Sequence, residues 1–405
     1  MEKSTEYVLQ GYTFLLEKKK TLCRTQATLR DPVDADLLRQ SLDALMRHTD
    51  YFHLKPICED EQFFLVPNDM PCEVYAEGEI RQIPEETNGY TFYVSYQAST
   101  VFFTFWHFIT DGRGSIRFMN ELIREYCNRR YGTEFACHGL YTDPMFSLEA
   151  LKERYGKEMS PARRENIPPM QNQEARHYLV RLSKDSVMRA AMEQNMWPFS
   201  YILYALSRFA QTEYKKDEVS LGYTMDMRDV IGVPNALYNC ACTHWFSLNM
   251  ASKAKNDILE EISDEIVQSM KPNTKAIKHL QIYQLFQDIY QSKRPMHIKQ
   301  IQNDMVVRTG QAHLVLSYLD APMDKEQKKM AEFIDDFQII LLTPPNSLFV
   351  SEVTWGKYMN LVVSSRFEDE KITEHLRAVF ERENIEVCVV KSLDYLKSGK
   401  EDTGK

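Results

Sequence analysis

Glycine is scarce in this chain, with 14 residues among 405. None of them belongs to a G-x-x-x-x-G-K-S/T pattern, the loop that cradles phosphate groups in P-loop enzymes, and this absence excludes a P-loop nucleotide enzyme. A dinucleotide-binding loop is also disfavoured. The pattern G-x-G-x-x-G would begin at Gly112 and Gly114, but Arg117 occupies its third glycine position.

An excess of positive charge is missing as well. The chain has 49 lysine and arginine residues against 58 aspartate and glutamate residues, which gives a net charge of −9. This balance argues against electrostatic capture of a nucleic acid. No run of about eighteen apolar residues occurs, so we expect no membrane span.

The eight cysteines are scattered and form no C-x-x-C pair. The first residues lack the basic start and apolar run of a secretory signal, which predicts a cytoplasmic protein with free thiols. One tight group could bind a metal, because Cys240, Cys242 and His244 would face one side of a strand. No further ligand pair accompanies them, so we favour a structural core there and predict no metal site.

The composition that remains is that of a globular protein, with 43% hydrophobic, 12% aromatic and 26% charged residues. At about 150 residues per domain, the length predicts two to three units. Residues 138–175 are rich in proline and charged side chains, which indicates a connection between two halves. The prediction is an N-terminal half at 1–150, a linker at 151–175, a C-terminal half at 176–396 and a disordered tail at 397–405.

Both halves are predicted to mix strands and helices, which makes the fold class α/β (α+β layered), with a mixed sheet flanked by helices in each half. No short repeat is visible, which disfavours solenoids and propellers. Apolar runs predict strands, and 3.6-residue spacing predicts helices. The strands are expected near 63–66, 91–96, 101–106, 177–182, 219–226, 237–248, 314–319, 337–342, 348–353 and 358–364. The helices are expected near 37–46 after the acidic start at Asp34, from 116 to an end near Gly132, from an opening near Ser183 and Asp185, and near 201–214, 256–270, 274–291 and 372–383.

The run at 101–106 is apolar at nearly every position, so we expect a central strand covered on both faces. It ends in His107, which is followed by a short loop and a helix. A neutral imidazole at a strand end can accept a proton from a hydroxyl, amine or thiol that attacks a carbonyl. Asp111 could orient this imidazole or pair with a distant cation, and Gly112 would permit the turn. A core histidine without a catalytic role is the alternative.

The pattern His107-x-x-x-Asp111-Gly112 resembles the H-x-x-x-D-G motif of the acyltransferases that use acyl thioesters and share the chloramphenicol-acetyltransferase-like fold. Two later stretches are similar to further motifs of this superfamily and occur in the same order. Residues 223–228, followed by 238–239, resemble its strand-borne arginine segment and the asparagine step after it. Residues 351–357 resemble a degenerate form of its D-F-G-W-G segment.

His107 lies early in the chain, and in this the sequence resembles the pseudo-dimeric branch of the superfamily, in which one chain contains two similar halves. That branch includes plant acyltransferases, condensation domains of nonribosomal peptide synthesis and bacterial alcohol acetyltransferases, and the last group is the most similar. Condensation domains carry two histidines in tandem, whereas Trp106 takes the first place here. The resemblance implies two chloramphenicol-acetyltransferase-like halves in one monomeric chain.

The resemblance also implies an activity. An acetyl or short acyl group would pass from acyl-CoA to the hydroxyl or amine of a small-molecule acceptor, with acyl-CoA as co-substrate and no tightly bound cofactor. His107 would act as general base in a tunnel between the halves. A phosphopantetheinyl carrier protein as donor, or a non-catalytic relative that only binds, are the alternatives.

Five further residues acquire roles by the same resemblance. Asp111 and Arg228 would form a structural pair, and a surface position is the alternative for Arg228. Ser317 could donate a hydrogen bond to the developing oxyanion. Trp355 and Gly356 would shape a loop between the halves, and an ordinary core position is the alternative for Trp355.

Overall fold

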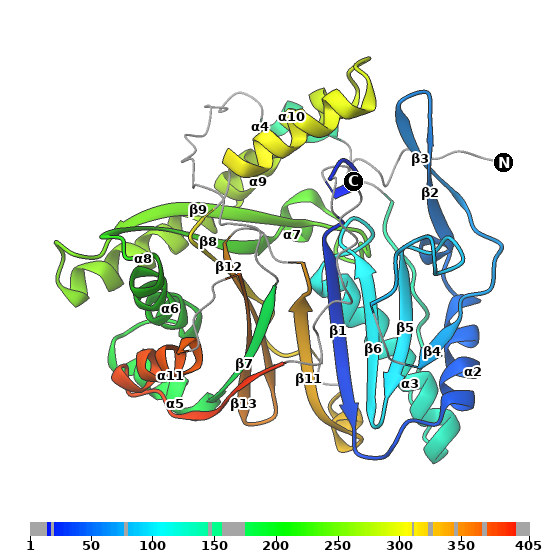
Figure 1. The fold of residues 1–405 in the computed structure, drawn as a ribbon, viewed down its shortest axis with the longest axis horizontal. Helices are drawn as coiled ribbons and strands as arrows, with labels where there is room; N and C mark the ends of the chain where they lie inside the picture. Colours follow the sequence, from blue (N-terminus) through cyan, green and yellow to red (C-terminus); the bar gives the residue numbers. More distant parts are fainter. Residues whose placement is uncertain are drawn as a thin grey trace.

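The structure is a computed structural model, and it describes residues 14–17, 20–76, 80–144, 148–155, 175–309, 312–322, 327–343, 347–366 and 371–393. Figure 1 shows two sheets side by side, with helices packed around them. The core of the protein therefore consists of two sheet-and-helix units. Of the predicted linker, residues 151–155 belong to helix α4 (Leu148–Tyr155) and 156–174 lie outside the described residues, as does the predicted tail at 397–405.

The first sheet is built around the apolar run that ends at His107. This run forms β6 (Thr100–Trp106), which lies between β1 (Leu22–Leu29) and β5 (Phe92–Gln97). On one face, the ring of Phe103 stacks on Phe118 of helix α3 (Gly112–Tyr131), with centroids 4.0 Å apart. On the other face, the guanidinium of Arg24 lies 4.8 Å from the ring centre of Phe102. The prediction of a central strand covered on both faces is confirmed.

The two outer strands of this sheet come from distant parts of the chain. β4 (Val74–Ala76) lies beyond β5, and β11 (Ile334–Leu341) lies beyond β1. β11 pairs antiparallel with β1, with Ala27 opposite Phe337. An unpaired edge of β1 would leave a row of backbone N–H and C=O groups without partners, and β11 satisfies them. A strand from the second half of the chain thus completes the first sheet, which local patterns did not predict.

The second sheet contains the remaining long strands, and it is mixed. β10 runs parallel to both of its neighbours, and the other pairs are antiparallel. In sheet order the strands are β14 (Val387–Ser392), β7 (Arg176–Ser183), β13 (Tyr358–Ser365), β12 (Leu348–Trp355), β10 (Leu314–Tyr318), β8 (Glu218–Asp226) and β9 (Ala241–Asn249).

Helices cover the outer face of each sheet. α2 (Ala35–Met46) packs beside α3 on the first sheet, and it begins at Asp34, whose carboxylate accepts the N–H groups of Asp36 and Leu37. α3 ends at Gly132, which has a φ of 65°, so the predicted end of this helix is confirmed. α5 (Lys184–Glu193), α6 (Pro198–Tyr214), α8 (Lys255–Ser269) and α11 (Ile372–Arg382) lie together beside the second sheet (Figure 1).

Three further helices and one hairpin occupy the upper part of the view in Figure 1. α9 (Pro272–Tyr290) contacts α4 and α10 (Met296–Thr309), and the hairpin consists of β2 (Leu54–Glu59) and β3 (Gln62–Pro67). The hydroxyl of Tyr290 donates to the backbone oxygen of Phe63 at 2.5 Å, and Lys299 donates to that of Glu61 at 2.7 Å. The hairpin of the first half is therefore fastened to helices of the second half.

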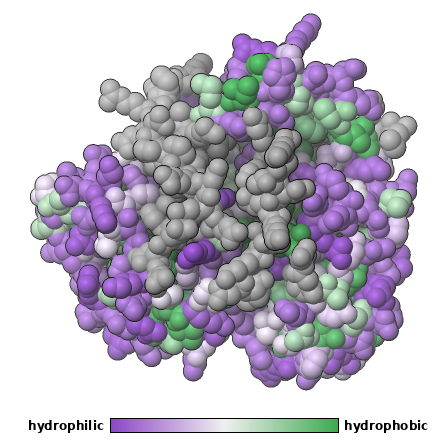
Figure 2. All heavy atoms as spheres, in the orientation of Figure 1, coloured by the Kyte–Doolittle hydropathy of each residue, from purple (hydrophilic) through white to green (hydrophobic). Residues whose placement is uncertain are grey.

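The described surface visible in Figure 2 is mostly hydrophilic, with small scattered apolar areas. None of the helices in the described part of the chain has the length and apolarity needed to cross a membrane. The eight cysteines are all free.

Candidate functional site

His107 follows β6 directly and is held from two sides. Its backbone N–H donates to the carbonyl oxygen of Thr21 at 2.8 Å, which ties it to the residue before β1. The ring of Phe14 stacks on its imidazole, with centroids 4.5 Å apart and planes 16° from parallel. The imidazole is partly buried, and this burial lowers its pKa, although a hydrogen bond with its own backbone oxygen and the charge of Asp111 oppose the shift. His107 is therefore neutral at neutral pH.

Asn239 is the polar side chain in contact with this imidazole. Its Nδ2 lies 3.1 Å from Nδ1 of His107 and 3.4 Å from the backbone oxygen of His107. The backbone N–H of Ala241 donates to Oδ1 of Asn239 at 3.0 Å, which fixes the orientation of the amide. Two tautomers of His107 are to be compared. In the first, Nδ1 is unprotonated and accepts from Asn239; in the second, Nδ1–H donates to the residue's own carbonyl, and Asn239 donates only to that same oxygen. Only the second leaves a lone pair on Nε2, and a base acting through Nε2 requires it.

The carboxylate of Asp111 contacts other groups than the imidazole of His107. One of its oxygens accepts from the N–H of Gly114 at 3.0 Å, and the other accepts from the N–H of Cys240 at 2.8 Å. Arg228 contacts both oxygens, each at 3.0 Å. Burial alone would raise the pKa of Asp111, but the guanidinium and the N–H donors outweigh it and hold the pKa below its usual value. Asp111 is a saturated carboxylate, so it has no free lone pair direction with which to relay a proton from His107.

Arg228 anchors this carboxylate from the second sheet. It is the first residue of the short helix α7 (Arg228–Ile231), which follows β8, and it is buried. Its guanidinium also donates to the backbone oxygens of Ala236 and Tyr238, at 3.0 and 3.1 Å. The Asp111–Arg228 pair therefore joins the loop after β6 to the segment between β8 and β9. A surface position for Arg228 is wrong.

Two glycines allow this close approach. A Cβ on Gly114 would lie 2.5 Å from the backbone oxygen of Leu237 and 2.1 Å from Oγ1 of Thr110, which are impossible distances. A Cβ on Gly112 would lie 2.8 Å from the methyl end of Leu319. Neither glycine is among the residues with positive φ. Gly112 thus supplies space rather than an unusual backbone turn.

Ser317 lies on β10, beside β8. Its Oγ accepts a hydrogen bond from Oγ1 of Thr224 at 3.1 Å. Ser317 pairs in register with Ser351 of β12, and both side chains lie on the sheet face shared with Thr224. Among the described residues, Ser317 has no hydrogen bond with His107.

Trp355 and Gly356 lie where β12 turns into β13. Gly356 has a φ of 57°, which a residue without Cβ adopts at no steric cost. The ring of Trp355 stacks on Phe337 of β11, with centroids 6.0 Å apart. Because β11 belongs to the first sheet, Trp355 is a buried core aromatic that also connects the two sheets.

The predicted strand at 237–248 is wrong at its start, because β9 begins at Ala241. The preceding residues instead direct Asn239 toward His107 and the N–H of Cys240 toward Asp111. Cys240 therefore does not share a strand face with Cys242 and His244. No group of three or more histidine, cysteine, aspartate or glutamate side chains with metal-binding geometry occurs in the described part of the chain.

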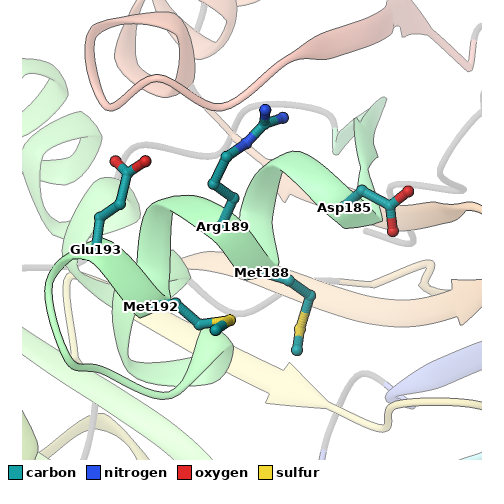
Figure 3. A pocket seen from close by; sticks show the side chains of 5 residues that line it. All are labelled: Asp185, Met188, Arg189, Met192 and Glu193. Atoms are coloured by element: carbon teal, nitrogen blue, oxygen red, sulfur yellow. The ribbon is translucent and has the colours of Figure 1, made fainter.

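A separate hollow lies on the surface of α5 (Figure 3). Met188 and Met192 project to one side of the helix, and Arg189 and Glu193 project to the other. Asp185 completes the lining. None of the predicted site residues lines this hollow, so it is not part of the His107 site.

Comparison with known proteins identifies the fold. No protein-family model and no curated protein matches the sequence. Solved structures do match. Polyketide synthase associated protein 5 from Mycobacterium tuberculosis is 13% identical, with a TM-score of 0.64 over 93% of this chain and 98% of that one. The chain has the fold of that protein, which solved condensation domains share.

Two further structures with this fold carry chemical information in their descriptions. A variant of the starter condensation domain of rhizomide synthetase, in complex with C8-CoA, has a TM-score of 0.61 and 11% identity over 92% of this chain and 91% of that one. Trichothecene 15-O-acetyltransferase from Fusarium sporotrichioides also has a TM-score of 0.61 and 11% identity, over 95% of this chain and 94% of that one. The predicted α/β class and pseudo-dimer of two similar halves are confirmed, while identities this low leave the reaction open.

Proposed function

We propose that this protein is an acyltransferase that moves an acetyl or short acyl group from acyl-CoA to the hydroxyl or amine of a small molecule. One observation carries the proposal: a neutral, partly buried imidazole stands at the end of the central strand, in contact with the segment that joins β8 to β9 of the other sheet. That position is suited to a general base between two sheets. The C8-CoA complex and the acetyltransferase with the same fold support a CoA thioester as donor.

The reaction needs one base and no covalent enzyme intermediate. Nε2 of His107 takes the proton of the acceptor while the acceptor's oxygen or nitrogen attacks the thioester carbonyl. The tetrahedral intermediate then collapses, the C–S bond breaks, and the imidazolium returns the proton to the departing thiolate. Burial favours this cycle because it keeps His107 unprotonated at the start.

Other residues of the site are proposed to position this base and the oxyanion. Asp111 and Arg228 hold the loop after β6 against the second sheet. Ser317 accepts from Thr224, so its own hydroxyl hydrogen is free to point at a carbonyl oxygen of the substrate. Trp355 and Gly356 keep the β12–β13 turn in contact with β11.

The test is the turnover of His107→Ala with a panel of acyl-CoA thioesters and small alcohols and amines. Turnover is measured as the release of free thiol. General base catalysis is worth about 10² to 10⁴ in rate, so we expect a loss of that size with an unchanged melting temperature. His138→Ala, at an exposed histidine, is the matched control and should keep full activity. Full activity of His107→Ala would contradict the proposal.

A carrier protein as donor is the second candidate, and one feature of the surface favours it. Lys293 and Arg294 are two exposed cations at the connection between α9 and α10 on a chain of net charge −9, and Glu61 accepts from the backbone N–H of Met296 in the same segment. An acidic carrier would require such exposed cations. Thermal shift and turnover with acetyl-CoA and longer acyl-CoAs, compared with an acylated carrier, separate the two donors. Binding without turnover in both arms would instead indicate a non-catalytic relative.

A further inference from the structure

A second cluster of ionisable side chains lies outside the His107 site, between β9, α8 and α9. His244 is a buried residue of β9, Glu265 belongs to α8, and Lys278 belongs to α9. Nε2 of His244 lies 2.5 Å from a carboxylate oxygen of Glu265. The Nζ of Lys278 contacts Nδ1 of the same ring and lies 3.3 Å from Nε2. Three elements thus bring a carboxylate, an imidazole and an amine into one hydrogen-bonded chain.

The contacts determine which atom carries which proton. A carboxylate accepts, so Nε2 of His244 donates its hydrogen to Glu265. Nδ1 then carries the lone pair, and it accepts from Lys278. Tyr223 and Phe246 flank the ring, with centroids 5.1 and 6.2 Å from that of His244, and hold it in place. In this order of partners, His244 is able to take a proton from Lys278.

Lys278 differs in its partner from other lysines of the second half. Lys275, on the same helix, donates to the carboxylate of Asp229 at 2.7 Å, and Lys255 is paired with Glu383. Lys299 donates to two backbone oxygens. A carboxylate partner keeps an ammonium charged, whereas an imidazole carries no negative charge and gives the ammonium no counter-charge. Burial lowers the pKa of Lys278 to about 8, with the neighbouring Cys242 thiol opposing the shift.

We propose that Lys278 is a self-acylation site, at which the protein's own lysine accepts the acyl group of a thioester. The neutral amine of Lys278 attacks the thioester carbonyl, and the C–S bond breaks as the C–N bond of the amide forms. His244 removes the proton from the amine nitrogen and Glu265 stabilises the imidazolium, after which the proton goes to the departing thiolate. Lys278 is only partly buried, and the proposal requires a thioester to reach its Nζ. The donor is the acyl-CoA of the proposed function, but His107 takes no part.

The experiment measures acylation of the full chain by acetyl-CoA and, separately, by S-acetyl-N-acetylcysteamine, a thioester without the nucleotide. The extent of acetylation at each lysine is followed over time by peptide mass spectrometry. Lys278 should react at least about tenfold faster than Lys271, an exposed lysine whose Nζ donates to the side chain of Gln268. Labelling of Lys278 at or below the rate of Lys271 with both donors would overturn the proposal.

Variants test the mechanism. His244→Gln should lower the labelling rate of Lys278 about tenfold or more, and Glu265→Gln should lower it several-fold. Because His244 is buried, His244→Gln could misfold, and circular dichroism and the melting temperature would reveal this. In that case the labelling rate of Glu265→Gln, at the more exposed residue, tests the cluster. The role of this cluster would be overturned if folded Glu265→Gln labels Lys278 at the wild-type rate and His244→Gln either does the same or misfolds.

One further variant separates this inference from the proposed function. His107→Ala should lose transfer to small acceptors while Lys278 is labelled at the wild-type rate. If transfer never occurs and Lys278 still reacts, the proposed function fails and the self-acylation site stands. If transfer occurs normally and Lys278 is unreactive, the self-acylation site fails alone.

Discussion

Two of the histidines that have a carboxylate nearby, His107 and His244, differ in what that carboxylate contacts. Near His107, Asp111 is occupied by Arg228 and two backbone N–H groups, and an amide side chain touches the imidazole. At His244, the carboxylate of Glu265 contacts the imidazole directly. The first arrangement uses the carboxylate to hold two sheets together and leaves the base to act alone. The second uses it to polarise the ring toward a lysine.

Burial also separates the two carboxylates. The side chains of Arg228 and Asp111 are 7% and 3% exposed, whereas that of Glu265 is 37% exposed. Removing one partner of a buried ion pair leaves an uncompensated charge, and this costs far more than breaking a partly hydrated pair. The comparison therefore predicts a large stability effect at the first site and a small one at the second.

The largest expected effect comes from Asp111→Asn. It leaves Arg228 without its counter-charge, so we expect a loss of about 3 to 5 kcal/mol in the free energy of unfolding, measured by urea denaturation. Glu265→Gln, the matched variant at the second site, should cost about 1 kcal/mol or less. Equal losses in the two variants would contradict the contrast in burial.

The pH dependence of stability gives an independent check on Asp111. Its pKa in the folded protein is lowered, so its ionised form contributes stability above the unfolded value of about 4, and that contribution is lost as the pH falls through the folded pKa. The difference in unfolding free energy between the wild type and Asp111→Asn should therefore shrink from pH 7 toward pH 3. A difference that stays constant would count against the pairing.

Gly114→Ala should have the next largest effect. The added Cβ would meet the backbone oxygen of Leu237, which cannot move without the segment that carries Asn239. We expect a loss of about 1 to 3 kcal/mol in unfolding free energy. Gly112→Ala is the control, because its Cβ meets only the flexible end of Leu319, and it should cost less. A larger loss in Gly112→Ala than in Gly114→Ala would show that the tight contact lies elsewhere.

Phe14→Ala should have the smallest effect and should act on catalysis rather than stability. Loss of the stacked ring exposes the imidazole of His107, so its lowered pKa should rise toward the ordinary value. Because the base must be unprotonated, the acid limb of the plot of kcat/KM against pH should move to higher pH. A loose imidazole should also reduce turnover about tenfold.

Phe14→Leu is the control for this variant, since it keeps apolar cover without the stacked ring. Its acid limb should lie between those of the wild type and Phe14→Ala. An acid limb that does not move in either variant would contradict a role of Phe14 in burying the base.

The sequence predicts the elements well where one local pattern dominates. The apolar run of β6, the capped helix after Asp34 and the end of α3 at Gly132 all follow from short-range rules. The short-range rules do not predict β1, because its polar residues Arg24 and Gln26 interrupt the apolar run although both are buried. Their partners come from distant segments, which no local pattern reveals.

The site likewise has one part that local patterns predict and another that depends on contacts between distant segments. A motif that spans six residues is enough to single out His107, Asp111 and Gly112, because a strand end, a loop and a helix start are local features. Short-range patterns are therefore enough to predict this motif, the mixed α/β class and the two-part plan. The packing of distant segments sets the other features: Phe14 on the imidazole, the contact of Lys278 with His244, and β11 in the first sheet. Each of these joins segments far apart in the chain, and such contacts form only when whole elements pack to bury their apolar faces and satisfy their backbone groups.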